Sequence, residues 1–219
     1  KEEIVKIKKF INFKKIFFGP EYFISNNSYK KEIKINEESK IKNVLIYFGA
    51  SKNSFLLKKL LDILKKEFFK NFSFVIIIGK YDFYNYSLKY RDKNFNFVKT
   101  LNNKSFLNIA SKCQISIGSG GVSCWERIKL GLFNLVIITA NNQIKSVKSL
   151  SRRRYIYSLG SLKKLNFNNL EIKLRKLFLD TKLINNARIR SKGLLIKNKV
   201  KLIKQYLKIW KIYSKTKSF

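Results

Sequence analysis

Residues 114–143, QISIGSGGVSCWERIKLGLFNLVIITANNQ, decide the fold of this chain. A short apolar run at 115–117 stops at the glycine-rich turn 118–121, and a helix is predicted to begin near Val122. A second apolar run at 135–138 follows that helix. A strand, a tight turn, a helix and a second strand, in that order, predict one crossover unit of a parallel α/β sheet.

The turn at 118–121 has the composition of a loop that binds an anion. Glycines let the backbone approach a ligand closely, and the N-terminus of the following helix offers free N–H groups and the positive end of its dipole. Glu126 lies about one turn into this helix, where its carboxylate can accept hydrogen bonds from a ribose diol. The pattern favours a nucleotide-sugar diphosphate, held at Gly120 and Gly121 by its phosphates. A plain strand-to-helix turn with a solvated carboxylate is the competing interpretation.

Two other loops are predicted at the same edge of the sheet, because parallel α/β sheets bind ligands beyond the carboxyl ends of their strands. In the first loop, Gly49 and Ser51 are candidates to approach the sugar or the phosphate. In the second loop, Asn142 and Gln143 are candidates to bond sugar hydroxyl or acetamido groups, since each amide has donors and an acceptor. A helix cap is the competing role of Asn142.

Side chains next to the glycines carry weaker signals. Ser119 and Ser123 are candidates for additional phosphate contacts, and local capping explains them equally well. Trp125 is expected to face the sheet as a core residue rather than to stack on a ligand. The basic triplet at 152–154 is expected to be a solvated cluster at a helix end.

Several segments match the pattern of a known family. They read GSGGVSCWE at 118–126, LGLF at 130–133, ANNQ at 140–143, FGPEY at 18–22 and IYFGAS at 46–51. In these segments the chain resembles the C-terminal half of GT-B-type nucleotide-sugar proteins. It is most similar to the UDP-sugar hydrolases of pseudaminic acid biosynthesis, and more distantly similar to the N-acetylglucosamine transferase of peptidoglycan assembly. The resemblance runs from about residue 17 to about residue 165.

The resemblance implies a Rossmann-like parallel sheet with helices on both faces, the nucleotide-binding half of a GT-B fold. It also implies a UDP-sugar as ligand, with UDP and a free sugar released by hydrolysis in nonulosonate synthesis. The chain departs from the family pattern at three places. Ala50 replaces the second glycine of a Gly-Gly-Ser loop, Phe133 replaces a proline, and residues 197–200 replace an Asp-Gly-x-Gly element.

No residue of this chain is assigned to catalysis. In the resembled hydrolases a histidine in a glycine loop of the N-terminal domain is thought to act, and this chain contains no histidine. The expectation is a nucleotide-binding half that is inactive alone and needs an N-terminal domain in cis or in trans. The alternatives are a GT-B glycosyltransferase with a UDP-sugar donor and a non-catalytic nucleotide-sugar-binding protein. Neither a metal nor a cofactor is expected, because no set of ligands has metal spacing.

The chain is expected to divide into three segments. Residues 1–40 are a remnant of the N-terminal domain and a linker, 41–193 the nucleotide-sugar-binding domain, and 194–219 a basic amphipathic helix and tail. Strands are expected at 44–48, 74–78, 95–98, 114–117, 135–139 and 155–157, and helices at 54–69, 104–111, 122–130, 143–154, 168–180 and 194–213. In the helix at 54–69 the predicted buried stripe is Phe55, Leu56, Leu60, Ile63, Leu64 and Phe68.

The chain is strongly basic, with 48 lysines and arginines against 13 acidic residues and a formal charge of +35. Only eight of the basic residues are arginine, and lysine is spread along the whole sequence together with other residue types that have A/T-rich codons. Codon bias explains this pattern better than a selected basic surface, so nucleic acid is not an expected partner. The segment 194–219 suits a terminal helix packed on a domain, with peripheral membrane contact as the alternative.

The remaining features favour a cytoplasmic protein. The sequence shows no secretory signal and no run of apolar residues long enough to span a membrane. Cys113 and Cys124 lack metal spacing and are expected to be buried free thiols. The chain also lacks methionine, even at position 1, which favours a sequence that starts inside a longer protein.

Overall fold

The computed structural model describes residues 41–49, 53–99 and 102–192. The expectations for segments 1–40 and 194–219, including the helix at 194–213, lie outside these residues, as do those for Ala50 and Ser51. Within the described ranges, no helix is long and apolar enough to cross a membrane.

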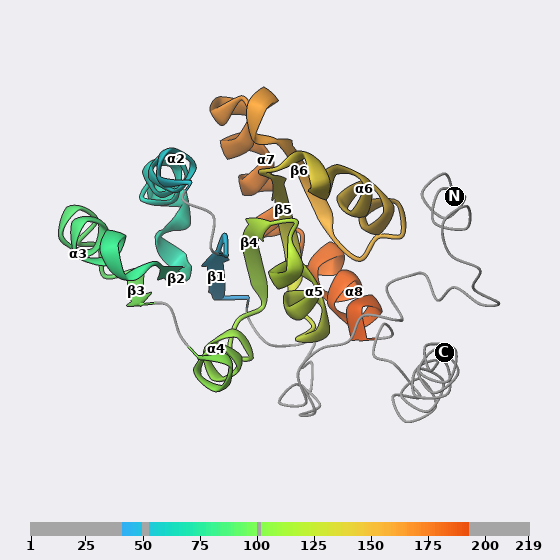
Figure 1. Cartoon of the computed structure of the whole chain (residues 1–219), viewed down its shortest axis with the longest axis horizontal. Helices are drawn as coiled ribbons and strands as arrows, with labels where there is room; N and C mark the ends of the chain where they lie inside the picture. Colours follow the sequence, from blue (N-terminus) through green and yellow to red (C-terminus); the bar gives the residue numbers. More distant parts are fainter. Residues whose placement is uncertain (1–40, 50–52, 100–101, 193–219) are drawn as a thin grey trace, which may run out of the picture. The chain divides into compact units, whose positions relative to one another are not determined.

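In the described part of the chain, six strands form one parallel sheet, and the predicted fold class is confirmed (Figure 1). The strands are β1 (Asn43–Tyr47), β2 (Ser73–Ile78), β3 (Phe95–Lys99), β4 (Ile115–Ser119), β5 (Phe133–Ile138) and β6 (Tyr157–Ser161). Their order across the sheet is β3-β2-β1-β4-β5-β6. The direction of winding therefore reverses between β1 and β4, and sheets of this kind bind ligands at that reversal.

Helices connect the strands and cover both faces of the sheet (Figure 1). The α-helices are α2 (Ser54–Leu64), α3 (Lys80–Lys89), α4 (Asn103–Ala110), α5 (Val122–Lys129), α6 (Ile144–Arg152), α7 (Phe167–Leu179) and α8 (Thr181–Lys192). The 3₁₀ segments are η3 (Glu67–Asn71), η4 (Asn141–Gln143) and η5 (Leu162–Lys164). Side chains alternate between the two faces along each strand, so the two sets of helices cover different residues of the same strands.

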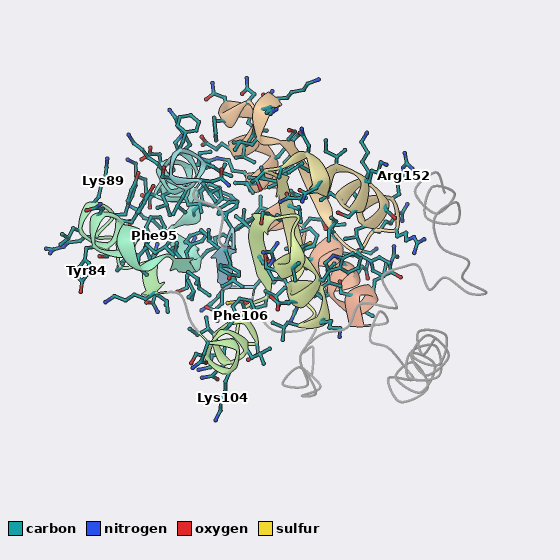
Figure 2. All side chains as sticks on the ribbon, viewed as in Figure 1. Tyr84, Lys89, Phe95, Lys104, Phe106 and Arg152 are labelled. Atoms are coloured by element: carbon teal, nitrogen blue, oxygen red, sulfur yellow. The ribbon has the colours of Figure 1, made fainter. Side chains whose placement is uncertain are left out.

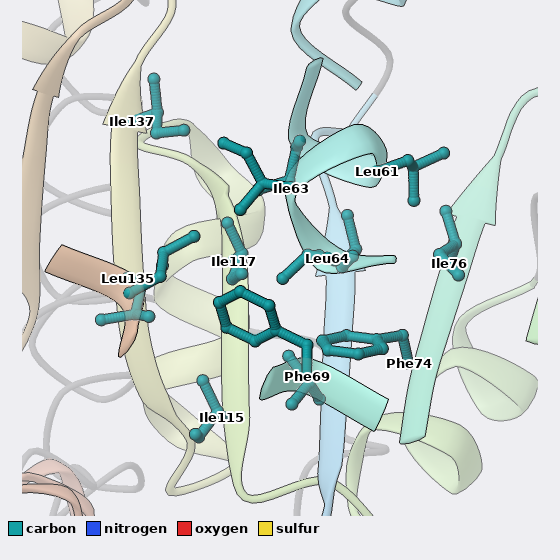
Figure 3. Packing of buried hydrophobic residues seen from close by; sticks show 14 of the residues in the cluster. Leu61, Ile63, Leu64, Phe69, Phe74, Ile76, Ile115, Ile117, Leu135 and Ile137 are labelled. Atoms are coloured by element: carbon teal, nitrogen blue, oxygen red, sulfur yellow. The ribbon is translucent and has the colours of Figure 1, made fainter. Parts of the chain in front are cut away.

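An extended apolar core lies on the first face of the sheet, under α2, η3, α7 and α8. Figure 3 shows Phe69 of η3 and Phe74 of β2 next to Ile115 and Ile117 of β4. Phe69 is fully buried, and its ring meets the ring of Phe178 edge-on at a centroid distance of 5.5 Å. Each such side chain stabilises the fold by about 1.5–3 kcal/mol through its burial.

The second face of the sheet has two separate apolar clusters. One lies between β1, β2 and α4, and the other lies between β5, α5 and α6. Between these clusters are three fully buried polar residues, Ser116, Asn134 and Arg127, which we call the polar centre. Burial of polar groups costs free energy unless they are hydrogen-bonded, so a polar centre in a core needs a specific explanation.

The helix predicted at 54–69 is wrong at its C-terminal end and in its buried stripe. α2 ends at Leu64, and Lys66 is extended before η3 begins. After this break, Phe69 of η3 is fully buried in the core. Phe55 is 60% exposed, whereas Leu57 and Leu61 are buried in its place.

The strand predicted at 155–157 is displaced: β6 begins at Tyr157 and runs to Ser161. Its sequence, YSLGS, has no run of apolar residues, and it becomes a strand because it pairs with β5 across an irregular register. The helices α3 and α8 were not predicted, because their apolar residues do not form a strong stripe. Neighbouring elements, rather than local sequence, determine these segments.

The expectation for the two cysteines is confirmed. Cys113 and Cys124 are both buried and free. Burial raises the pKa of the Cys113 thiol to about 12, and burial also raises the pKa of Cys124. Both thiols therefore stay protonated near neutral pH and are poor nucleophiles.

Candidate functional site

The loops that follow β1 and β4 lie side by side at the reversal point of the sheet. The buried hydroxyl of Ser119 donates to the carbonyl of Phe48 at 3.0 Å, which joins the two loops. A Cβ atom added to Gly49 would lie 3.8 Å from Oγ of Ser123 in the first turn of α5. The first loop and the N-terminus of α5 therefore form one continuous edge, where ligands of such sheets bind.

The glycines of this edge have different physical roles. Gly49 has a φ of +72°, a conformation that favours glycine. A Cβ on Gly120 would lie 2.3 Å from Cγ2 of Val147, so Gly120 is required for the packing of α6. A Cβ on Gly121, the N-cap of α5, would have only Nε2 of Gln143 nearby, at 3.8 Å. Gly121, like Gly49, therefore has free space beside it, and it lies next to the free N–H groups of a helix.

Gln143 connects the end of β5 to the glycine turn. Its Oε1 accepts from the N–H of Gly120 at 3.2 Å and from the N–H of Thr139 at 3.1 Å. Its Nε2 lies 3.2 Å from Oγ1 of Thr139. The amide oxygen of Gln143 thus holds the glycine turn in place. If Gln143 contacts a sugar, its Nε2 makes the contact. Asn142, its neighbour in η4, is exposed.

Glu126 is half-buried on α5, close to the end of β1. The pKa of Tyr47 is raised by burial and, as the second cause, by the charge of Glu126. Glu126 also interacts electrostatically with the guanidinium of Arg127. Its carboxylate therefore belongs to the same edge as the two loops.

The weaker candidates have mainly structural contacts. The hydroxyl of Ser119 is buried and joins the loops, and Ser123 Oγ accepts from Nη1 of Arg127 at 3.3 Å. Trp125 is half-buried against the apolar cluster of α5 and α6, in agreement with its predicted core role. The arginines at 152–154 are exposed, as predicted.

Arg127 is the residue of this edge that reasoning from the sequence missed. Its guanidinium donates from Nη1 to the carbonyl of Tyr47 at 2.8 Å and from Nη2 to the carbonyl of Ser119 at 2.8 Å. Its Nε donates to Oδ1 of Asn134 at 3.1 Å. Arg127 lies within the helix predicted at 122–130, and Asn134 lies just before the strand predicted at 135–139, so neither was a candidate.

Basic side chains lie on several helices of the described domain. Figure 2 shows Lys89 of α3, Lys104 of α4 and Arg152 of α6 on separate helices, and all three are exposed. Among the described residues, no group of three or more His, Cys, Asp or Glu side chains could hold a metal ion.

Comparison with known proteins finds similar structures but no similar sequences. No protein-family model matches this sequence, and no curated protein matches it. Solved structures do match. The glycosyltransferase of kitacinnamycin superposes with a TM-score of 0.59 and 13% identity over 83% of this chain. MurG of Acinetobacter baumannii superposes with a TM-score of 0.58 and 14% identity over 78% of this chain. UDP-GlcNAc 2-epimerase from Neisseria meningitidis, bound to UDP-GlcNAc, superposes with a TM-score of 0.58 and 19% identity over 78% of this chain.

The chain spans less than half the length of these three structures, namely 47%, 49% and 44% of them. At such low identities the likeness establishes the fold alone. The described domain has the Rossmann-like α/β fold of the C-terminal half of a GT-B glycosyltransferase. Function has to be argued from the residues at the edge of the sheet.

Proposed function

We propose that this chain binds a UDP-sugar and is the nucleotide-binding half of a GT-B-type enzyme. The observation that carries the proposal is the convergence of two glycine-containing loops, the N-terminus of α5 and Glu126 at the reversal point of the sheet. The diphosphate would lie beside Gly121 and the free N–H groups of α5. The ribose hydroxyls would donate to the carboxylate of Glu126.

The sugar would lie toward the loop after β5. Asn142 is exposed there, and Gln143 has its Nε2 on the side of Gly121. Gly49 would approach the sugar or phosphate from the first loop, with Ser51 as a further candidate. The ligands bound in two matched structures support this ligand class. The epimerase is bound to UDP-GlcNAc, and spinosyn rhamnosyltransferase SpnG is in complex with thymidine diphosphate.

The reaction that we propose is hydrolysis of the UDP-sugar to UDP and a free sugar, in pseudaminic acid synthesis in the cytoplasm. The support for hydrolysis is the match of the segments at 118–126 and 140–143 to the hydrolase pattern. The chain has no histidine to activate water, so the catalytic groups would come from an N-terminal domain, in cis or in trans.

A glycosyltransferase is the second candidate, because several of the matched structures carry that name. The two reactions differ in what releases UDP. With the N-terminal domain supplied, a hydrolase releases UDP and free sugar in equal amounts without an acceptor. A transferase releases UDP in quantity only when an acceptor hydroxyl is present. Measuring free sugar and UDP in the absence of acceptor therefore distinguishes the two.

The binding proposal is tested by isothermal titration of the chain with UDP, and with CDP and ADP as controls, at low and high salt. We expect UDP to bind more tightly than CDP and ADP and to retain its affinity in high salt. Equal binding of all three nucleotides that vanishes with salt would mean that the overall charge of +35 attracts anions without a site.

A further inference from the structure

Arg127 is a buried cation at the floor of the proposed nucleotide site. Its side chain is fully buried, yet its hydrogen-bond acceptors are all neutral: two backbone carbonyls, one amide and one hydroxyl. Within the described residues, no carboxylate lies within ion-pair distance of it. Glu126 acts on this guanidinium electrostatically but forms no direct ion pair with it. A buried charge without a direct ion pair is costly, so the position of Arg127 needs an explanation.

The two carbonyls that Arg127 binds belong to the ends of the two central strands. Tyr47 is the last residue of β1, and Ser119 is the last residue of β4. Without the guanidinium, these carbonyl oxygens would present negative partial charge to an anion bound at this edge. Both bonds are 2.8 Å long and come from separate nitrogens, so the guanidinium bridges the two strand ends.

The local sequence makes room for this guanidinium. A Cβ on Gly118 would lie 2.5 Å from Nη1 of Arg127 and 2.1 Å from the carbonyl oxygen of Tyr47. Asn134 of β5 accepts from Nε and also from the hydroxyl of Ser116 at 2.6 Å. The polar centre of the second face therefore surrounds Arg127 and fixes its orientation.

We propose that Arg127 is a positioning residue for the diphosphate: it clamps the ends of β1 and β4 together and supplies the fixed positive charge beneath the phosphates. Its partners Ser119 and Ser123 belong to the turn and helix that would hold these phosphates. The charge is held in a dry environment, where it acts more strongly on an anion than a surface lysine does. This role rests on the proposed nucleotide site and adds to it the source of its affinity for phosphate.

Arg188 provides a matched control. It is a second buried arginine, 5% exposed, on α8, and its Nε donates to the carbonyl of Gly131 at 3.2 Å. Gly131 lies just before β5, so this contact is at the opposite end of the strands from the proposed site. Replacing either arginine removes a buried guanidinium, but only Arg127 lies beneath the phosphates.

The test is to titrate the wild-type chain and the variants Arg127→Gln, Arg127→Lys, Arg188→Gln and Arg188→Lys with UDP, UMP and uridine, and to record their thermal unfolding. We expect Arg127→Gln to weaken UDP binding about tenfold, UMP less, and uridine by less than about twofold. Arg127→Lys keeps the charge but loses the clamp, and we expect about threefold weaker UDP binding. The Arg188 variants should lower the unfolding temperature without changing the affinity for any ligand.

Three outcomes decide the matter. If Arg127 variants weaken all three ligands equally, or match the Arg188 variants, Arg127 only supports the fold and the inference is overturned. If the wild-type chain does not bind UDP, the proposed function itself fails. If Arg127→Gln does not fold, Arg127→Lys compared with Arg188→Lys decides: unchanged UDP affinity in both contradicts the inference, and a loss confined to Arg127→Lys supports it.

Discussion

The two faces of the sheet are built differently at their centres. On the first face, one continuous apolar core runs from α2 to α8 across the central strands. On the second face, the apolar packing is divided, and the polar centre of Ser116, Asn134 and Arg127 lies between its two parts. Both faces belong to the same strands, so the difference is set by alternate residues of β4 and β5.

We expect this difference to separate stability from nucleotide binding. An apolar core stabilises a fold in proportion to the apolar area that it buries, and this effect does not depend on what binds at the strand ends. The polar centre buries less apolar area, but it connects directly to the backbone at the reversal point through Tyr47 and Ser119. We therefore expect changes on the first face to alter stability alone, and changes in the polar centre to alter both stability and affinity for a nucleotide.

The largest expected effect is on the first face. Phe69→Ala empties a fully buried site, and we expect it to lower the free energy of unfolding by about 4 kcal/mol in urea denaturation. UDP affinity, measured where the variant is still folded, should stay within about twofold of wild type. Phe55→Ala is the control, since that ring is 60% exposed and should cost under about 1 kcal/mol. A large loss of UDP affinity in Phe69→Ala would break the separation of the two faces.

A smaller loss of stability is expected when the polar centre is made apolar. Asn134→Leu leaves Nε of Arg127 and the hydroxyl of Ser116 without their common acceptor, and we expect a cost of about 3 kcal/mol. UDP binding should weaken several-fold, because the guanidinium is no longer oriented. Asn142→Leu, at an exposed position, should leave stability within about 0.5 kcal/mol. If Asn134→Leu were more stable than wild type, the polar centre would not be needed to hold Arg127.

Two glycines at strand ends offer a sharper test of the same idea. Gly118→Ala forces a Cβ to within 2.1 Å of the Tyr47 carbonyl oxygen, so we expect a cost of about 2 kcal/mol and weaker UDP binding. Gly79→Ala follows β2, where nothing lies within 4 Å of the added atom, and should change stability by less than about 1 kcal/mol. Denaturation curves of the two variants give the comparison directly. Equal effects would mean that the space beside Gly118 is not specific for Arg127.

The sequence predicted the architecture well because the buried strands are short apolar runs. The runs at 74–78 and 115–117 cannot lie at the surface, and their spacing by helices requires a parallel sheet. β6 and α8 were harder to predict because their residues adopt regular structure only through pairing with β5 or packing on the core. Local patterns carry no information about such long-range contacts.

At the site, the sequence indicated the glycine turn and Glu126 but not how the edge is held together. Gln143 was expected to face a ligand, and its oxygen instead binds the backbone of Gly120 and Thr139. Arg127 was overlooked because a charged residue beside a predicted binding loop reads as exposed. The structure shows instead that it is fully buried and that its acceptors lie on two separate strands.

The central claim is that the edge at the reversal of the sheet is a nucleotide site in which Glu126 binds the ribose. The most direct measurement is the affinity of Glu126→Ala for UDP by isothermal titration, compared with the wild-type chain and with Glu67→Ala. The carboxylate of Glu67 is exposed and belongs to η3, which lies before β2 and outside the proposed site. We predict that Glu126→Ala loses about 1–3 kcal/mol of binding free energy while Glu67→Ala binds as wild type does. Equal affinities in all three proteins would contradict the account.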